Sequence, residues 1–194
     1  MLTPTQLKAA FDAGLSYEKY VATGTPGQQA DWREFERLAR DEASLTTQQR
    51  SLLSDFTRRV NVLVISGLWC GDCAQQCPLL AMIAERAEHV VDLRFVDRDE
   101  QSQLAEQVKI CGGLRVPTVL FMNEDFEFVA LAGDKTLSRL RAAAHRKLGA
   151  VCPIPGSPVP GDEIAATLVD WLNELERVHL LLRLSPKLRQ RHGD

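Results

Sequence analysis

The amino-acid sequence predicts an α/β fold, in which a central mixed β-sheet is flanked by helices and extended by further helices at both ends. Residues 60–66 form a β-branched apolar run, which is typical of a strand buried on both faces. The patterns over residues 60–150 follow the order strand, helix, strand, helix, strand, strand, helix. This order predicts a sheet with at least one parallel strand pair.

Residues 1–59 are expected to form a helical extension that packs on the core. Thr3-Pro4 and Thr25-Pro26 each join an N-cap residue to a proline at the first helical position. Apolar residues follow both starts at helical spacing, and a third helix is expected over residues 45–58. These helices should pack on the sheet domain, because an isolated helix cannot bury its apolar stripe.

Residues 60–150 are expected to form the main domain. After the strand at 60–66, the pattern indicates a helix over 70–88, a strand over 92–97 and a short helix over 100–108. Two strands, 118–122 and 126–131, flank the hairpin signal Asn123-Glu124-Asp125. An amphipathic helix over 136–148 completes the domain.

The last two segments lie outside this domain. Residues 151–161 are rich in proline and glycine, so they are expected to form a linker or an extended arm. Residues 162–194 carry a long apolar stripe at helical spacing to about 184, followed by a basic tail. This amphipathic helix could dock on its own domain or form a homodimer interface.

Composition narrows the functional classes. The net charge of −3 offers no general attraction to nucleic acid or to an anionic membrane. No apolar run approaches the roughly 20 residues that a membrane span needs, and no secretory signal begins the sequence. A cytoplasmic location is therefore expected. Thiols are kept reduced there, so paired cysteines suggest redox chemistry or metal binding before structural disulfides.

The segment Trp69-Cys70-Gly71-Asp72-Cys73 follows the buried strand and opens a helix. A thiolate is the nucleophile in disulfide exchange, and the N–H groups and dipole of a helix N-terminus favour an anion. Cys70 is therefore expected to have the lower pKa and to attack, and Cys73, one turn later, to resolve the mixed disulfide. A pair of buried or metal-binding thiols is the alternative.

With these residues, the chain resembles the thioredoxin superfamily over residues 60–150. Arg115-Val116-Pro117-Thr118 stands where that family has its cis-proline loop, and Pro78 stands where the family kinks its active-site helix. Gly133 matches a glycine near the substrate groove. The WCGDC form and the helical N-terminal extension are similar to a bacterial thioredoxin-like subgroup.

The resemblance implies roles for individual residues. Pro117 should be cis and pack against the Cys70–Cys73 pair, and the backbone of Val116 should bind an extended substrate by strand addition. The implied substrate groove also includes Trp69, Gly71, Asp72 and Gly133.

Two positions depart from the family pattern. Val64 stands six positions before the first cysteine, where thioredoxins carry a buried acid that takes a proton from the second cysteine. Release of substrate is then expected to be slower or to use another base. Asp72 replaces a proline, and its charge should disfavour a nearby thiolate, modestly if the carboxylate is solvent-exposed. Asp72 could instead select substrates or be a solvated acid at the helix start.

The other cysteines and the histidines are weaker candidates. Cys77 can share a helical face with Cys70 and Cys73, so it is either an auxiliary redox sulfur or a small apolar core residue. Cys111 and Cys152 are expected to be incidental. The spacing CxxC-x3-C matches neither a paired zinc knuckle nor a ferredoxin run, so no metal and no cofactor are expected. The four histidines are expected at the surface or at helix caps, without catalytic roles.

The sequence therefore predicts a thiol–disulfide oxidoreductase that reduces disulfides of proteins or of low-molecular-weight thiols. Its partners would be such a disulfide substrate and an unidentified reductase or thiol donor, with neither nucleic acid nor a membrane involved. The alternative is a redox-sensing or adaptor protein that uses the same fold to bind partners with little turnover.

Overall fold

A computed structural model describes residues 2–148 and 161–193 of the chain. This part contains four strands and nine helices, arranged in the order that the patterns of the central domain predict. The helices are α1 (Pro4–Ala13), α2 (Tyr17–Ala22), α3 (Pro26–Glu42), α4 (Thr47–Ser54), α5 (Gly71–Arg86), α6 (Ser102–Gln107), α7 (Leu137–Leu148), α8 (Gly161–Leu184) and α9 (Pro186–His192). The strands are β1 (Val60–Ser66), β2 (Val91–Asp97), β3 (Thr118–Met122) and β4 (Phe128–Gly133).

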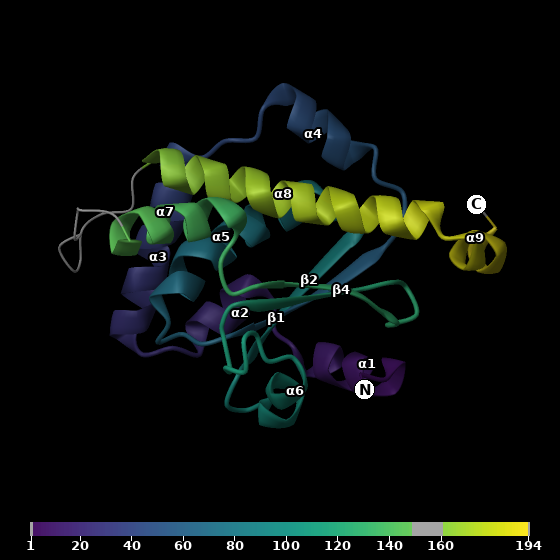
Figure 1. The fold of residues 1–194 in the computed structure, drawn as a ribbon, viewed down its shortest axis with the longest axis horizontal. Coiled ribbons are helices and arrows are strands. Elements are labelled where there is room, and N and C mark those ends of the chain that lie inside the picture. The colour runs from purple at the N-terminus through teal and green to yellow at the C-terminus, as the bar shows by residue number, and fades with distance from the viewer. Residues whose placement is uncertain (1, 149–160, 194) are drawn as a thin grey trace.

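The four strands form one mixed sheet in the order β2-β1-β3-β4. β1 pairs parallel with β2 and antiparallel with β3, and β3 pairs antiparallel with β4. Every residue of β1 is buried, as expected of a central strand covered on both faces. Figure 1 shows α8 and α7 along one side of the sheet, and α1 and α6 on the opposite side. The α/β fold predicted from the sequence is confirmed.

The N-terminal helices pack directly on the sheet domain. Thr3 and Thr25 cap α1 and α3 with their side chains, as their sequence signals indicate. Leu15 exchanges two backbone hydrogen bonds with Phe95 of the edge strand β2, at 2.9 and 2.8 Å, so the extension covers this edge. Trp32 of α3 is fully buried, and its indole N–H donates to the Leu68 carbonyl at 3.1 Å. The extension thereby supports the loop that precedes Cys70.

The C-terminal helix α8 docks on its own domain. It packs against α5, α3, α7 and β4. Its apolar stripe is buried there, with Trp171 at the centre, 1% exposed. The apolar stripe of α8, which was a candidate homodimer interface, is therefore largely covered by other parts of the same chain. Self-association through this helix stays a prediction.

Some element boundaries differ from the sequence patterns. The last strand begins at Phe128 instead of Phe126, because Phe126 has a positive φ of 59° and belongs to the preceding turn. Asn123 closes this turn, since its side-chain oxygen accepts from the N–H groups of Asp125 and Glu127. Residues 151–160 of the expected linker lie outside the described residues, and its last residue, Gly161, begins α8. Within the described residues, every helix is too short or too polar to cross a membrane.

Candidate functional site

Cys70 stands between the buried strand β1 and the helix α5. It occupies the N-cap position of α5 with extended backbone angles, and its N–H donates to the Gly67 carbonyl at 2.9 Å. Gly71 follows in open space, with no atom within 4 Å of where a side chain would begin. The sequence therefore places a sulfur at the first turn of a helix, with backbone N–H groups directed toward it.

The two sulfurs of the motif differ in exposure. Cys70 is half-buried, whereas Cys73, one turn further into α5, is fully buried. The Cys70 thiol donates toward the Val116 carbonyl oxygen with an Sγ–O distance of 3.7 Å, and it also hydrogen-bonds with the Cys73 thiol. Only Cys70 is thus open to an incoming molecule, and Cys73 lies directly behind it.

Both thiols of the pair have a pKa above the ordinary value of a cysteine. The hydrogen bond with the Cys73 thiol raises the pKa of Cys70 most, and partial burial raises it further. Backbone N–H groups of Asp72 and Cys73 lower the pKa of Cys70, as a helix N-terminus should, but they are outweighed. Burial also raises the pKa of Cys73. That Cys70 has the lower pKa of the two thiols, as its place at the helix start indicates, stays a prediction.

The loop before β3 faces the sulfurs. The Val116–Pro117 peptide bond is cis, and the Thr118 hydroxyl donates to the Arg115 carbonyl at 2.8 Å. Gly133, at the end of β4, lies against this loop with a φ of 131°. A Cβ atom at Gly133 would stand 2.2 Å from the Pro117 carbonyl oxygen, so only glycine fits there.

Asp72 is held by two cations instead of being solvated. Lys135 bonds one carboxylate oxygen at 2.6 Å and Arg139 the other at 3.0 Å. Arg139 is 5% exposed and also bonds Gln75 at 2.6 Å. Although partial burial opposes them, these hydrogen bonds keep the pKa of Asp72 below its usual value. The interpretation of Asp72 as a solvated helix acid is therefore wrong, and its charge is largely neutralised beside the thiols.

Replacing Asp72 with asparagine is expected to lower the free energy of unfolding by about 1–3 kcal/mol at pH 7, because the nearly buried Arg139 loses the nearer of its two carboxylate partners and keeps only Glu163, at 3.7 Å. A carboxyl whose pKa is lowered on folding stabilises above its unfolded pKa, about 4, and loses this effect as the pH falls through the folded value. The loss should therefore shrink toward pH 3. Chemical denaturation of both proteins at pH 7 and pH 3 measures it.

The matched control for this prediction is Asp41→Asn. Asp41 forms an exposed ion pair with Arg37 within one helix, so its replacement should cost about 0.5 kcal/mol or less at either pH. Equal losses for Asp72→Asn and Asp41→Asn at pH 7 would show that the bonds to Lys135 and Arg139 do not stabilise the fold.

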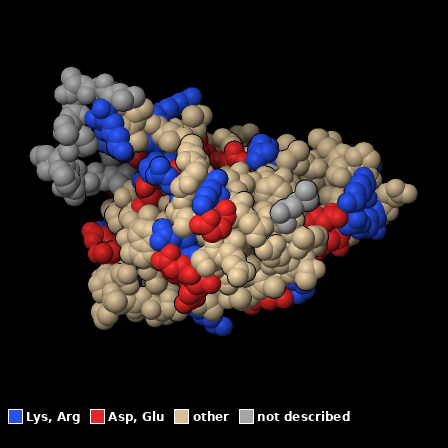
Figure 2. Space-filling model, turned by 60° about the horizontal axis from the view of Figure 1, so that its bottom comes forward, with Lys and Arg blue, Asp and Glu red and all other residues tan. Residues whose placement is uncertain are grey.

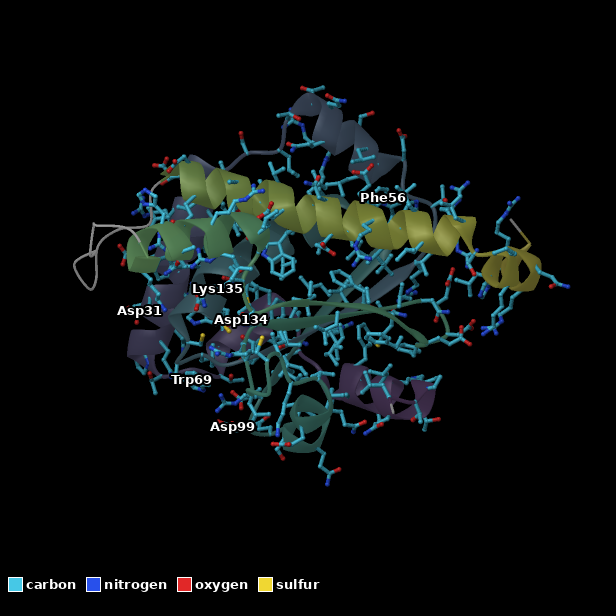
Figure 3. The ribbon with its side chains drawn as sticks, in the orientation of Figure 1. Asp31, Phe56, Trp69, Asp99, Asp134 and Lys135 are labelled. Atoms are coloured by element: carbon cyan, nitrogen blue, oxygen red, sulfur yellow. The ribbon has the colours of Figure 1, made fainter. Side chains whose placement is uncertain are left out.

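Trp69 forms the exposed rim of the site. Its side chain is 53% exposed, and the Arg98 guanidinium lies 4.6 Å from the ring centre, within cation–π distance. Figure 3 labels Trp69 together with Asp134 and Lys135, which lie on the segment after β4. Asp134 is tied to α5, because its carbonyl accepts from the Gln76 side chain at 2.9 Å.

The N-terminal extension lines a cavity of about 330 Å³ next to Trp69. Tyr20 of α2, Gln28 of α3 and Asp97 at the end of β2 are among the residues that line it. The extension thus contributes to the surface around the exposed tryptophan. Figure 2 shows a face of the molecule on which positive and negative side chains are interspersed, without a large area of one sign.

The other candidate residues from the sequence differ in their burial. Cys77 is fully buried in α5, and Val64, at the place of the family's acid, is fully buried too. Cys111 is exposed, and Cys152 lies outside the described residues. His179 is buried and stacks on Phe56 with ring centres 4.2 Å apart, so its expected surface position is wrong. In residues 2–148 and 161–193, no three His, Cys, Asp or Glu side chains are placed to hold a metal ion.

Comparison with known proteins agrees with this geometry. A family model described as thioredoxin matches residues 14–134, more than half of the 194 residues. The chain therefore belongs to this thioredoxin family. The match begins within the N-terminal helices. It therefore starts well before residue 60, where the resemblance seen in the sequence begins.

Two solved structures share the fold over most of this chain. A protein of unknown function from Pseudomonas aeruginosa superposes with a TM-score of 0.69 at 16% identity, covering 92% of this chain and 97% of that one. An HIV epitope scaffold gives a TM-score of 0.60 at 20% identity, over 89% and 92% of the two chains. Mitochondrial thioredoxin 3 from Saccharomyces cerevisiae is 22% identical over 50% of this chain and 86% of its own, with a TM-score of 0.32. No curated protein matches the sequence.

Proposed function

We propose that this protein is a thiol–disulfide oxidoreductase that reduces disulfides of proteins or of small thiols. The observation that supports this proposal best is the pairing of a half-exposed Cys70 with a buried Cys73 at the start of α5. A substrate sulfur can reach Cys70 but not Cys73. The arrangement therefore suits one attacking and one resolving thiol.

The proposed reaction has two exchange steps. Cys70 loses its proton and attacks one sulfur of the substrate disulfide, which releases the other substrate sulfur as a thiolate and leaves a mixed disulfide on Cys70. Cys73 then attacks the Cys70 sulfur, which releases the second substrate thiol and forms the Cys70–Cys73 disulfide. An unidentified reductase or thiol donor returns both cysteines to thiols, in a reducing compartment such as the cytoplasm.

Substrate positioning is proposed for the residues around the two sulfurs. The Val116 backbone lies beside the Cys70 sulfur, where an extended substrate segment could pair with it by strand addition. Trp69, Gly71, Asp72, Pro117 and Gly133 are proposed as the other residues of the substrate groove. The N-terminal extension, through the cavity next to Trp69, would limit which substrates approach.

A second candidate function is a redox-sensing or adaptor protein with little turnover. The raised pKa values of both thiols favour it, because a thiol that stays protonated attacks slowly. Such a protein would form a reversible Cys70–Cys73 disulfide but would show negligible steady-state reduction of any disulfide with any reductase.

Replacing Cys73 with serine is expected to trap the substrate on Cys70, because the mixed disulfide then has no resolving thiol. The variant should accumulate dithiothreitol-sensitive adducts with a disulfide peptide or with oxidised glutathione, and mass spectrometry should place them on Cys70. Cys111→Ser, which changes an exposed cysteine outside the motif, is the matched control and should form no lasting adduct through Cys70. The absence of any adduct on Cys70 in the Cys73→Ser variant would refute the proposed function.

A further inference from the structure

Cys77 is a buried nucleophile that the proposed reaction does not use. It lies in α5 four residues after Cys73, and both side chains are fully buried. Residues four apart on a helix are neighbours on one face, with Cβ atoms roughly 5–6 Å apart. A disulfide needs Cβ atoms roughly 3.5–4.5 Å apart, so a Cys73–Cys77 bond requires the turn between the two residues to tighten.

Cys73 stands between two thiols. Both other thiols influence the pKa of Cys73: beside the dominant effect of burial, Cys70 lowers it and Cys77 raises it. The sulfur of Cys77 also lies 3.9 Å from the hydroxyl of Ser66, at the end of β1. The site thus has one half-exposed sulfur and two fully buried sulfurs, and a hydroxyl that can exchange a proton stands beside Cys77.

The helix is weakened at this place. Pro78, directly after Cys77, lies inside α5 and has no N–H to donate to the Ala74 carbonyl. A proline inside a helix also pushes against the carbonyl four residues earlier, which opens the turn. The turn from Cys73 to Cys77 can therefore adjust at lower cost than a regular helical turn.

We propose that Cys77 is a third redox sulfur, which exchanges with the Cys70–Cys73 disulfide and holds the oxidised state in the core. The proposal rests on the proposed function, because that reaction supplies the first disulfide. The Cys77 thiol loses its proton, and its sulfur attacks Cys73. The Cys73–Cys77 bond forms, the Cys70–Cys73 bond breaks, and Cys70 leaves as a thiolate that takes up a proton. One disulfide replaces another, so no further oxidant is needed.

The exchange would change what the protein can do. With Cys73 bonded to Cys77, Cys70 is a free thiol that can still form a mixed disulfide but has no thiol behind it to resolve it. The oxidised protein would then hold a partner on Cys70 instead of releasing it. Reduction of the Cys73–Cys77 bond by a small thiol would restore the reductase.

The test uses the full chain with Cys111→Ser and Cys152→Ser, which leaves three cysteines in one tryptic peptide, residues 60–86. After equilibration of this three-cysteine chain in oxidising glutathione buffer, acid quenching and alkylation, we expect Cys70 to be alkylated or bound to glutathione and fragmentation to show a Cys73–Cys77 bond. The same chain with Cys77→Ser is the matched control, in which Cys70 and Cys73 should be the bonded pair.

A three-cysteine chain whose intramolecular disulfide is Cys70–Cys73 alone, with Cys77 alkylated in every buffer, would overturn the proposal. In that outcome the Cys70–Cys73 disulfide still forms, so the proposed function stands and only the role of Cys77 is lost. If neither this chain nor its Cys77→Ser variant forms a disulfide, the proposed function fails as well.

Discussion

Replacing Cys70 with serine is expected to abolish disulfide reduction, with a loss of about a thousandfold or more, because no other sulfur of the motif is open to a substrate. Cys73 is fully buried directly behind Cys70, and a serine hydroxyl is a poor nucleophile at neutral pH. Reduction of insulin or of a disulfide peptide by the purified protein measures this loss. Cys111→Ser is the control and should keep the wild-type rate.

The wild-type rate should also rise with pH above neutrality. The hydrogen bond with Cys73 and partial burial raise the pKa of Cys70, so the attacking thiolate becomes more abundant as the pH increases toward that raised value. A rate that is flat between pH 7 and pH 9 would show that Cys70 is already ionised at pH 7. If the Cys70→Ser variant kept its activity, Cys70 would not take part in the reaction.

Replacing Gly133 with alanine is expected to destabilise the fold by about 4 kcal/mol or more, the largest stability effect that we predict. Its φ of 131° is rarely adopted by a residue with a side chain, and the added Cβ would stand 2.2 Å from the Pro117 carbonyl oxygen. Any relief of this clash has to move the Val116–Pro117 segment away from Cys70, so activity should fall as well. Chemical denaturation and the disulfide-reduction rate measure the two effects.

Gly27→Ala is the matched control for Gly133→Ala. Gly27 lies in the first turn of α3, where an added Cβ meets nothing within 4 Å, so this change should alter stability by about 1 kcal/mol or less. If Gly133→Ala were as stable and as active as Gly27→Ala, the close packing of β4 against the proline loop would not matter for the site.

Local signals predicted most of the fold. The β-branched run at β1 and the threonine-proline starts of α1 and α3 each act over a few residues, and the structure has these elements where expected. The short helices α2 and α9 were missed, because helices of six and seven residues depend on tertiary contacts more than on their own sequence. Tyr20 of α2, for example, stacks on Phe95 of a distant strand.

The residues of the candidate site can be named from the sequence, but their electrostatic surroundings cannot. The motif from Cys70 to Cys73 and the proline loop are short patterns that can be read in the sequence. Asp72 is bonded to Lys135 and Arg139, which lie 63 and 67 residues away from it along the chain. No local sequence pattern therefore indicates these two contacts. The basic residues that follow Gly133 were the one available signal, because that glycine was already expected near the groove.

The raised pKa of Cys70 was not predicted from the sequence, for a similar reason. A helix N-terminus is visible in the sequence, and its N–H groups do lower the pKa of Cys70. The stronger opposing effect depends on how closely the Cys73 thiol approaches and on how far the pair is buried. Both are consequences of packing, which spacing in the sequence does not give.

The account depends on a reversible bond between Cys70 and Cys73. The most direct measurement equilibrates the Cys77→Ser protein in glutathione buffers of graded ratio, quenches with acid, alkylates the free thiols and identifies the modified cysteines by mass spectrometry. We predict that a Cys70–Cys73 disulfide forms in oxidising buffer and disappears in reducing buffer. A protein in which both cysteines stay alkylatable across the whole range would contradict the account.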